Sequence, residues 1–237
     1  MEMRFLRLRT GSQTWRDGTP RTTPLVVDRA RKFGRDQCVT CIHKTRCQLV
    51  TGGHDAGKSY WLRRLAEAAP QIWRAPALVL GARDPVTMWC ESAPAVAAWW
   101  DALPVSDRRA PWAQLRQWER IEALPRYVEA VGAVLVVDDA HALTGRKLAI
   151  VTRCVAAARI WVCSATDEER ISPTLRAAVQ RRDPQTHRLA TDVAYDGTAA
   201  LMWVCALVAL GLGAWEIAAV ISGLRLLAHG RRAARQS

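Results

Sequence analysis

The chain has 237 residues, of which 50% are hydrophobic, and this length suffices for one sizeable domain with attachments or for two small domains. The seven cysteines do not form the even framework of a small secreted protein, and the first ten residues lack the apolar core of a secretory signal, so a reducing cytosol is favoured. A net charge of +12, in which arginine far outnumbers lysine, favours phosphate-bearing partners such as nucleic acid or an anionic membrane surface.

Residues 1–46 are expected to form a basic, turn-rich N-terminal extension. Eleven Lys or Arg side chains stand against four acidic ones in the first 50 residues, and the last thirteen residues carry four Arg and no acid. Such basic runs either contact phosphate or form solvated faces that aid solubility, and the sequence leaves both interpretations open. A weak periodicity predicts one helix near residues 28–33.

The extension ends in a cluster of potential metal ligands. Three thiols and one imidazole lie within ten residues, at Cys38, Cys41, His43 and Cys47. Four such groups could close a tetrahedral Zn²⁺ site. The spacing matches no strong zinc motif, however, and the alternative is a set of reduced structural thiols in which Cys47 begins the first buried strand.

Residues 47–195 are expected to form an α/β domain, because continuous apolar runs predict buried strands and helical patterns lie between them. The predicted strands cover residues 47–51, 76–82, 133–139 and 159–165, with a candidate fifth over 187–193. Helices are predicted over residues 58–69 and 144–158. Two or three Trp-rich helices are predicted within residues 85–131, with breaks at Pro104, Pro111 and Pro125. A last helix is predicted with Ser172 and Pro173 at its start. Such an alternation predicts a parallel sheet covered on both faces, whose ligand site lies at the carboxyl ends of the strands.

The stretch QLVTGGHDAGKSYWL, residues 48–62, fits the pattern G-x-x-x-x-G-K-[ST] between a predicted strand and a predicted helix. Its eight positions are Gly52, Gly53, His54, Asp55, Ala56, Gly57, Lys58 and Ser59. The glycines allow successive N–H groups to point at a phosphate, and the helix adds its positive N-terminal end. The pattern therefore predicts a nucleotide-binding loop in which Lys58 reaches the β- and γ-phosphates and the Ser59 hydroxyl binds Mg²⁺. His54 and Asp55, at the loop tip, are expected to face solvent.

The run VLVVDDAHAL resembles a Walker B strand, in which a carboxylate after four apolar residues orients Mg²⁺. Asp138 is the predicted metal-side carboxylate. Asp139 stands where a glutamate normally polarises the attacking water, and it either serves as a shorter base or only pairs with a nearby arginine. His141 is expected to pack inside the domain or to contact a partner.

From Cys47 to about Val193 these motifs resemble the P-loop ATPases that carry an extra strand between the two Walker motifs, above all the AAA-type group. The resemblance implies ATP and Mg²⁺ as cofactors and a homo-oligomer. The DDAH sequence is similar to the DEAH-like box of the helper ATPases of transposition and secretion. Two features depart from these families: the chain has no room after residue 193 for the small helical lid of AAA proteins, and it lacks the glutamine that translocase relatives carry after the fourth strand.

The resemblance implies two further roles. In many such ATPases a polar residue at the end of the fourth strand senses the γ-phosphate, and Ser164 is the better candidate here; capping a turn is the alternative. In ring-forming members an arginine before the last strand enters the active site of the neighbouring subunit. Arg181 or Arg182 stands at that place, and a solvated basic helix end is the alternative.

Residues 196–237 are expected to form a membrane segment with a basic tail. Residues 199–228 carry only Glu216 and Arg225 as charges and are long enough to cross a bilayer. A single span would place either the ATPase domain or the arginine-rich end outside, whereas a hairpin turning near residues 211–213 would keep both in the cytosol on two short arms. The positive flanks favour the hairpin. The predicted location is a membrane, with the ATPase domain on its cytoplasmic side.

Two functions fit these features. The first is a membrane-attached, oligomerising ATPase that uses hydrolysis to move or remodel nucleic acid, as a protein of a phage or mobile element would. The second is a nucleotide-dependent switch that recruits a protein partner to the membrane. A phage assembly or packaging motor differs from the first by gene context more than by sequence, since an ATPase core with a membrane segment also resembles the zonula-occludens-toxin-like and packaging ATPases of phages.

Overall fold

The structure, a computed structural model, describes residues 3–16, 18, 20–29, 37–91, 93–189 and 211. The chain divides into two compact units, Met1–Thr191 and Asp192–Ser237. Nearly all of the second unit lies outside the described residues, and with it the predicted membrane segment over residues 196–237. Within the described residues no helix is both long and apolar enough to cross a membrane.

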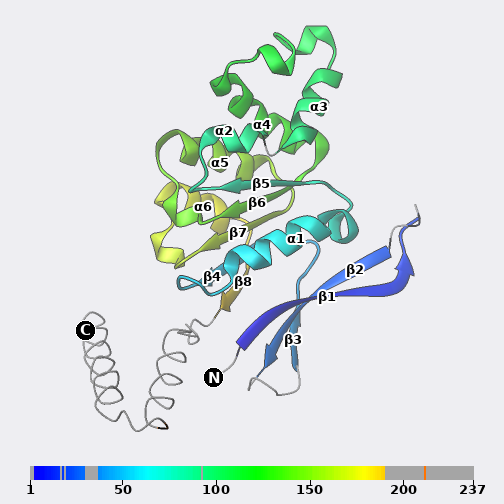
Figure 1. The fold of residues 1–237 in the computed structure, drawn as a ribbon, viewed down its shortest axis with the longest axis vertical. Helices are drawn as coiled ribbons and strands as arrows, with labels where there is room; N and C mark the ends of the chain where they lie inside the picture. Colours follow the sequence, from blue (N-terminus) through cyan, green and yellow to red (C-terminus); the bar gives the residue numbers. More distant parts are fainter. Residues whose placement is uncertain are drawn as a thin grey trace, which may run out of the picture. The chain divides into compact units, whose positions relative to one another are not determined.

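Two sheets form the described part of the first unit (Figure 1). The central sheet is parallel throughout, as the sequence predicts, with strand order β5-β6-β7-β4-β8. Its strands are β4 (Gln48–Gly52), β5 (Ala77–Gly81), β6 (Val134–Asp138), β7 (Trp161–Ala165) and β8 (Gln185–Leu189). The second sheet is antiparallel, with order β1-β2-β3, and consists of β1 (Met3–Thr14), β2 (Pro20–Arg29) and β3 (Gln37–Cys41).

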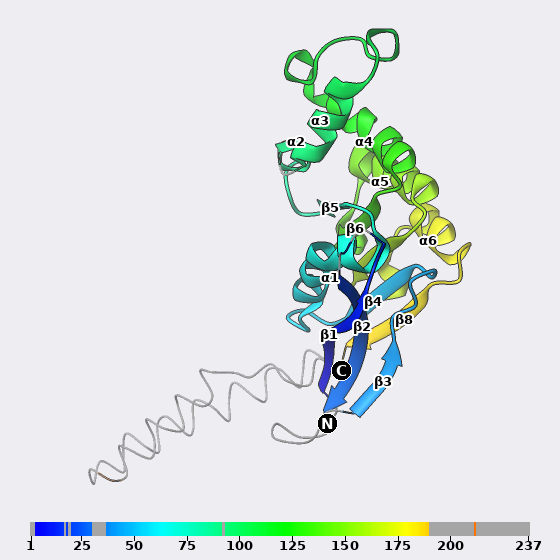
Figure 2. The ribbon, with the colours of Figure 1, turned by 90° about the vertical axis from the view of Figure 1, so that its right-hand side faces the viewer.

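Helices connect the central strands. They are α1 (Lys58–Trp73), α2 (Val86–Glu91), α3 (Pro94–Ala102), α4 (Gln117–Val131), α5 (Gly145–Ala157) and α6 (Pro173–Gln180). Short 3₁₀ turns lie at η1 (Val105–Asp107), η2 (Trp112–Gln114), η3 (Ala140–Ala142) and η4 (Glu168–Arg170). Figure 2 shows α2 and α3 at one end of this unit and the three-stranded sheet at the opposite end.

Each face of the central sheet packs against its own hydrophobic cluster, because successive residues of a strand point to opposite faces. On β6, Val134 and Val136 belong to the cluster that includes Leu65 of α1, whereas Leu135 and Val137 belong to the cluster formed with α4, α5 and α6. Burial on both faces explains why these strands read as continuous apolar runs.

The strand order brings the three polar strand ends together. β7 lies between β6 and β4, so the residues that follow these three strands meet at one edge of the sheet. This is the edge at which parallel sheets place ligand sites. The topology therefore sets the segments after β4, β6 and β7 beside one another.

The first residues form a sheet rather than the turn-rich extension expected from the sequence. Asp28 and Arg29 belong to β2, so the predicted helix over residues 28–33 is wrong at these two positions, and residues 30–36 lie outside the described part of the chain. One face of this sheet is apolar and covers α1, where Leu6, Val26 and Ile42 join the cluster of Leu65.

Hydrogen bonds also tie the antiparallel sheet to α1. The Arg64 Nη1 group donates to the Leu6 carbonyl at 3.2 Å, and Thr22 Oγ1 donates to Gln71 Oε1 at 2.7 Å. Trp15 Nε1 donates to the Gln71 carbonyl at 3.0 Å. The N-terminal strands are thus part of the same packed unit as the central sheet.

The Trp-rich helices expected between residues 85 and 131 are present as α2, α3 and α4. Their aromatic rings pack edge to face and at tilted angles, with Trp99 against both Trp100 and Tyr127, and Trp100 against Trp112. Pro104 and Pro111 stand immediately before the two 3₁₀ turns of this region and break the helices as predicted. The predicted break at Pro125 is wrong, because α4 continues through it.

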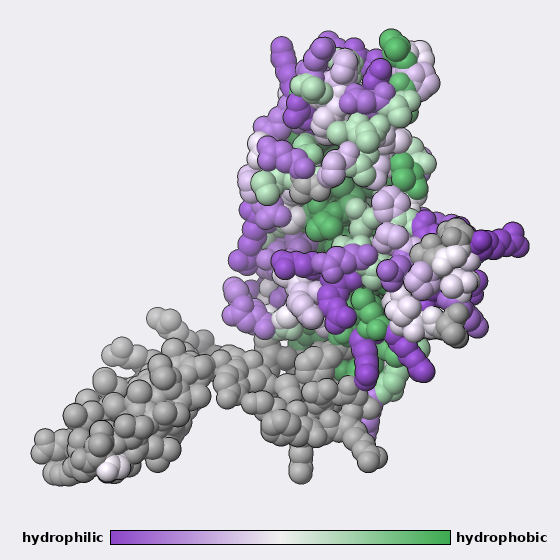
Figure 3. Space-filling model, turned by 45° about the vertical axis from the view of Figure 1, so that its right-hand side comes forward, coloured by the Kyte–Doolittle hydropathy of each residue, from purple (hydrophilic) through white to green (hydrophobic). Residues whose placement is uncertain are grey.

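The surface of the described residues is mixed in character. On the face shown in Figure 3, hydrophobic residues lie in the middle of the surface between projecting hydrophilic side chains. Among the described residues the large hydrophobic side chains that are exposed include Tyr60, Val79 and Trp118.

A buried leucine tests whether α1 is held between the two sheets. Leu65 is fully buried, so Leu65→Ala is expected to lower the free energy of unfolding by about 2–5 kcal/mol, from lost burial and the cavity left behind. The measurement is urea denaturation. Glu67→Ala, at an exposed position of the same helix, is the control and should change stability by less than about 0.5 kcal/mol. Equal, small effects of both changes would contradict the packing of α1 between the sheets.

Candidate nucleotide-binding site

The predicted phosphate-binding loop runs from the end of β4 to the start of α1. β4 is buried along its whole length and ends at Gly52, and α1 begins at Lys58. Gly57, the residue before α1, has a φ of 80°, a left-handed conformation that glycine adopts without strain. The strand, loop and helix that the motif predicts are therefore present in the predicted order.

Gly52 is needed for a different reason, which is the close approach of β8. A Cβ atom at this position would lie 2.7 Å from the Leu189 carbonyl oxygen and 3.1 Å from the Ala56 Cβ. The Gly52 N–H donates to the Thr166 carbonyl at 3.2 Å. The start of the loop is thus fixed between β8 and the segment after β7.

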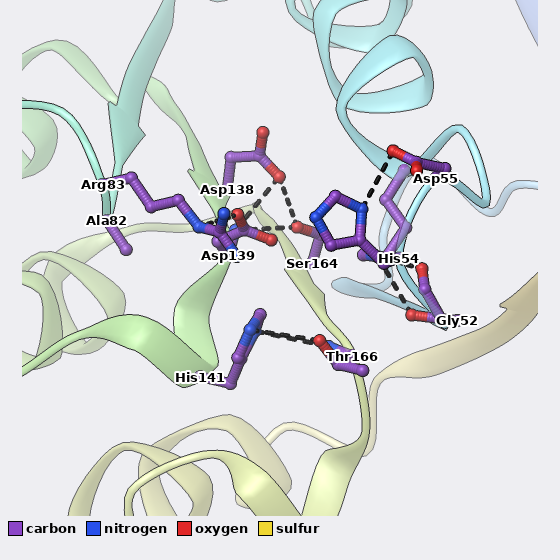
Figure 4. A network of polar contacts seen from close by, with 12 residues as sticks. Gly52, His54, Asp55, Ala82, Arg83, Asp138, Asp139, His141, Ser164 and Thr166 are labelled. Atoms are coloured by element: carbon purple, nitrogen blue, oxygen red, sulfur yellow. Dashed lines mark hydrogen bonds and ion pairs between the residues drawn. The ribbon is translucent and has the colours of Figure 1, made fainter. Parts of the chain in front are cut away.

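Lys58 is buried inside the loop, with 7% of its surface exposed. Its ammonium group donates to the carbonyls of Gly52 at 2.9 Å and Gly53 at 2.6 Å. A buried charge requires such partners, and phosphate oxygens would meet the same need. His54 and Asp55 are exposed at the loop tip, as predicted, and His54 Nδ1 lies 2.9 Å from Asp55 Oδ1 (Figure 4).

The two carboxylates of the predicted Walker B strand lie beside the end of β7. Asp138 is the last residue of β6, and Asp139 follows it. Ser164 Oγ donates to Asp138 Oδ1 at 2.5 Å and accepts from the Asp139 N–H at 2.9 Å (Figure 4). Ser164 is fully buried in β7, so its contacts are with the acidic pair, and its expected role as a γ-phosphate sensor stays a prediction.

Asp139 forms an ion pair with Arg83, a residue that lies outside the predicted motifs. Arg83 Nε lies 2.9 Å from Asp139 Oδ2 (Figure 4). This is the pairing that the sequence left open as the alternative to a catalytic role. The φ of Asp139 is 54°, in the left-handed region, which is uncommon for a residue other than glycine and is often found at functional sites.

The loop that carries Arg83 is held in place by two side chains from other elements. Lys147 Nζ of α5 donates to the Ala82 carbonyl at 2.9 Å and to the Asp84 carbonyl at 2.5 Å. Trp89 Nε1 donates to the Gly81 carbonyl at 2.8 Å. The position of Arg83 over Asp139 is therefore built into the fold around it.

His141 and Thr166 join the turns that follow β6 and β7. The Thr166 N–H donates to His141 Nδ1 at 3.3 Å, so Nδ1 carries no proton and Nε2–H faces Thr166 Oγ1 at 3.1 Å. Burial is the main cause of a lowered pKa of His141; Asp139 acts in the opposite direction, and the positive charges of Lys58, Arg83 and Arg170 lower the pKa further. The ring is therefore neutral at pH 7 and packs within the domain, as expected.

These groups surround a hollow of about 280 Å³. Its walls come from the phosphate-binding loop and from the segments after β5, β6 and β7: His54, Asp55, Ala56, Gly57, Lys58, Ser59, Arg83, Asp139 and Thr166. A second hollow of about 470 Å³ adjoins it, shares Ser59, Arg83 and Asp139, and includes Asp138. The structure thus brings together the predicted loop, the predicted acidic pair and Arg83.

The residues predicted to bind magnesium fit that ion. Ser59 and Asp138 both line the second hollow and offer a hydroxyl and a carboxylate oxygen. Mg²⁺ prefers oxygen ligands and binds through one or two protein groups together with water and phosphate. The donor set therefore suits a magnesium ion that accompanies a nucleotide.

The two predicted finger arginines lie outside the walls of this hollow. Arg182 donates to the carbonyls of Ala156, Ala158 and Arg159 at the end of α5 and just beyond it. Arg181 is the exposed C-cap of α6. A role in the site of a neighbouring subunit stays a prediction for both residues.

The possible zinc site is not formed by the described residues. The described residues contain no group of three or more His, Cys, Asp or Glu side chains that could hold a metal ion. Cys38 and Cys41 are exposed on β3, and Cys47 is buried at the start of the central sheet. Burial raises the pKa of the Cys47 thiol, whose sulfur lies 4.0 Å from the Arg159 carbonyl, so the alternative of a protonated structural thiol holds for this residue.

The sequence matches no protein-family model, and no curated protein is similar to it at a significant level. Among solved structures, the chain is similar to Cdc6p from Pyrobaculum aerophilum, with 21% identity, a TM-score of 0.40, and coverage of 61% of this chain and 38% of that one. EccC from Thermomonospora curvata (ATPases 2 and 3, in complex with a signal sequence peptide) has 16% identity, a TM-score of 0.42, and coverage of 77% and 39%. Domain III of the Thermotoga maritima replication initiation protein DnaA has 14% identity, a TM-score of 0.38, and coverage of 62% and 55%.

The chain therefore spans between about two fifths and just over half of the length of these three structures. Because their TM-scores are below 0.5, these similarities carry no argument about the site, and the site is described from the geometry of the chain itself. A glycine loop that encloses a buried lysine, an acidic pair at the end of the third central strand and strand order β5-β6-β7-β4-β8 coincide here. The described core therefore contains a candidate nucleotide-binding site, with a loop suited to phosphate beside an acidic pair suited to a metal ion.

The neutral state of His141 predicts a pH dependence of stability. Because its pKa is lowered in the folded chain, the unfolded chain binds a proton more readily below a pH of about 6.5, and stability should fall as the pH drops through that range. His141→Gln is expected to remove this part of the dependence in urea denaturation at pH 5.5 and 7.5.

His54→Gln, at the exposed loop tip, is the control for replacing a histidine with glutamine, and it should leave in place the part of the pH dependence that His141 carries. If the pH dependence persists in full in His141→Gln, the contacts between His141 and Thr166 do not carry it.

Proposed function

We propose that the protein binds ATP with Mg²⁺ in this hollow and hydrolyses it, and that a membrane-attached homo-oligomer uses hydrolysis to move or remodel nucleic acid. One observation carries the first half of the proposal. The ammonium group of Lys58 is enclosed by the carbonyls of the glycine loop, in the same hollow as Asp139 and beside Asp138. A cation suited to phosphate and carboxylates suited to metal and water therefore lie close together, which supports the proposal.

Each residue of the site has a role that follows from its contacts. The amides of the loop and Lys58 bind and orient the phosphates, and Ser59 and Asp138 hold the magnesium ion, which neutralises phosphate charge when bound. Asp139 accepts a proton from the attacking water once its carboxylate is released by Arg83. Ser164 positions both acids through its two hydrogen bonds.

The nucleic-acid half of the proposal is supported by charge. The whole chain carries a net charge of +12, and a basic protein attracts the phosphate backbone from solution. Arginine is the more frequent of the two basic residue types in this chain, and its guanidinium group binds phosphate through two parallel hydrogen bonds. A protein of a phage or mobile element, including an assembly or packaging motor, would use these same properties.

The ion pair between Arg83 and Asp139 favours a second candidate, the nucleotide-dependent switch that recruits a protein partner. The carboxylate expected to act as base is engaged, and Asp139 is also one methylene shorter than the usual glutamate. Such a site would bind ATP well and hydrolyse it slowly. Single-turnover hydrolysis measured with and without DNA separates the two functions, since only the motor requires fast turnover stimulated by DNA.

The test of ATP hydrolysis uses two substitutions with different expected results. Lys58→Ala should lower both ATP binding and hydrolysis, the latter by about 10²- to 10³-fold, because a cation that stabilises transferring phosphate is lost. Asp139→Asn should retain ATP binding and lose hydrolysis, because the amide cannot accept the proton from water. Binding is measured by calorimetry and hydrolysis by phosphate release.

Arg159→Ala is the matched control, since this exposed arginine precedes β7 and lies at the opposite end of the strand from the site. It should leave both quantities unchanged. The proposal fails if the unaltered chain gives no calorimetric heat with ATP and Mg²⁺, or if Lys58→Ala hydrolyses ATP at the normal rate.

Membrane attachment is proposed from the sequence alone, because residues 199–228 lie outside the described residues apart from residue 211. The full chain is expected to stay with lipid vesicles through an alkaline wash. Leu207→Arg combined with Val220→Arg should release it, since each arginine at the centre of a membrane helix costs about 2.5–3.5 kcal/mol. The pair Leu207→Ala and Val220→Ala is the control and should remain bound. Release of the unaltered chain would refute the membrane proposal and leave ATP hydrolysis untouched.

A further inference from the structure

The three-stranded sheet has one face that does not pack on α1, and this face is basic. In β1, Arg7 and Arg9 alternate with Leu6 and Leu8, so the arginines point away from the apolar cluster under the sheet. Arg7 and Arg9 are exposed, whereas Leu6 is buried. The register sets Arg9 opposite Thr23 of β2.

This face contains two adjoining hollows of about 530 and 540 Å³, which share Arg9, Thr10 and Leu25. Arg7 lines one of them, and Arg21, Thr23 and Lys44 line the other. We call the surface formed by Arg7, Arg9, Arg21, Thr23 and Lys44 the outer sheet face. It offers four cationic side chains and one hydroxyl group along two adjoining hollows.

Three cations gather around the indole of Trp15 at one end of this face. Arg21 lies 4.3 Å from the ring centroid, and Lys44 and Arg74 lie 5.3 Å from it. The Arg21 Nε atom is buried and has no hydrogen-bond partner among the described residues. Burial, and next the charge of Arg21, lower the pKa of Lys44, which shows how closely these positive groups are crowded.

Crowded cations with an unsatisfied donor are stabilised by an anion. Guanidinium groups bind phosphate oxygens through parallel hydrogen bonds, and threonine hydroxyls donate to phosphate as well. Arg7 and Arg9, two residues apart on one strand, lie about 7 Å from each other along it, so they present a row of charges rather than a point. A row of charges fits a chain of phosphates.

We propose that the outer sheet face binds the sugar–phosphate backbone of a nucleic acid. A membrane surface fits it less well, since proteins that bind membranes by one face insert exposed apolar side chains, and among the residues of the three strands whose side chains the structure describes only Val39 is a large exposed hydrophobic residue. The hydroxyl and guanidinium groups of this face instead match the donors that contact the backbone of nucleic acids.

The inference rests on the proposed function, of which nucleic-acid binding is a part, and it adds the surface at which the nucleic acid is held. The sheet packs on α1, whose first residues belong to the phosphate-binding loop and whose C-cap is Arg74, one of the cations around Trp15. Nucleic acid on this face would therefore act on the same helix as the nucleotide.

The test measures binding of the full chain to a fluorescently labelled DNA oligonucleotide, single-stranded and duplex, by anisotropy without nucleotide. Arg7→Gln with Arg9→Gln is expected to weaken binding at least about tenfold and to reduce the slope of log affinity against log salt by about 2, because two phosphate contacts are lost. Arg7→Lys with Arg9→Lys should keep the salt slope of the unaltered chain.

Arg109→Gln with Arg159→Gln is the control, as it removes the same charge from exposed positions that line neither hollow of the outer sheet face. It should weaken binding less than about twofold. Circular dichroism and thermal unfolding of each variant establish that the fold is retained.

The proposal is overturned if the glutamine pair at Arg7 and Arg9 and the control pair lose affinity equally, if the unaltered chain binds neither DNA form, or if the Arg7 and Arg9 variant loses binding to anionic vesicles but not to DNA. Binding at this face without stimulation of ATP hydrolysis would instead support the inference and contradict the motor function.

Discussion

The nucleotide site depends on one constraint, the burial of both faces of the central sheet. Because α1 with the N-terminal strands covers one face and α4, α5 and α6 cover the other, the three inner strands β4, β6 and β7 can present charged groups to water only where they end. Asp138 lies at the last position of β6, directly after four fully buried residues. A shift of one residue in the register of β6 would draw this carboxylate toward the interior, so the apolar strand holds Asp138 in place.

The acidic pair is held by contacts from three neighbouring segments. Ser164 joins Asp138 to the backbone of Asp139, and Arg83 engages the Asp139 side chain. A left-handed conformation costs a residue such as Asp139 about 1–3 kcal/mol, and it persists only where the surroundings determine it. Since Lys147 fixes the loop of Arg83, the ion pair is supported by the fold around it. Whether a bound phosphate can draw Arg83 away decides between a motor and a switch.

The central sheet and most of the site could be predicted from the sequence, because each depends on local signals. Continuous apolar runs identify strands buried on both faces, and the spacing of Gly52, Gly57 and Lys58 identifies the loop. Arg83 could not be found in this way, since nothing near it in the sequence shows that its loop folds over Asp139. The zinc prediction failed because closeness in the sequence is not closeness in space: residues of an exposed strand and a buried strand start do not converge.

The sequence of the N-terminal sheet contains the alternating pattern of a strand, but its many arginines made this pattern hard to recognise. Leu6 and Leu8 alternate with Arg7 and Arg9, which is the period of a strand with one buried face, yet the many arginines suggested a solvated extension.

The helix α1 is held near both of its ends. Lys58 and Ser59 begin the helix inside the nucleotide site, and Gln71, near its other end, accepts hydrogen bonds from Thr22 and Trp15. The helix is about 24 Å long, and apolar contacts with the sheet run along it. Any displacement of α1 that accompanies phosphate binding must therefore carry the sheet along or break these contacts. The basic strands thus form one mechanical unit with α1, which is the arrangement required if a polyanion on their outer face is to influence the candidate nucleotide site.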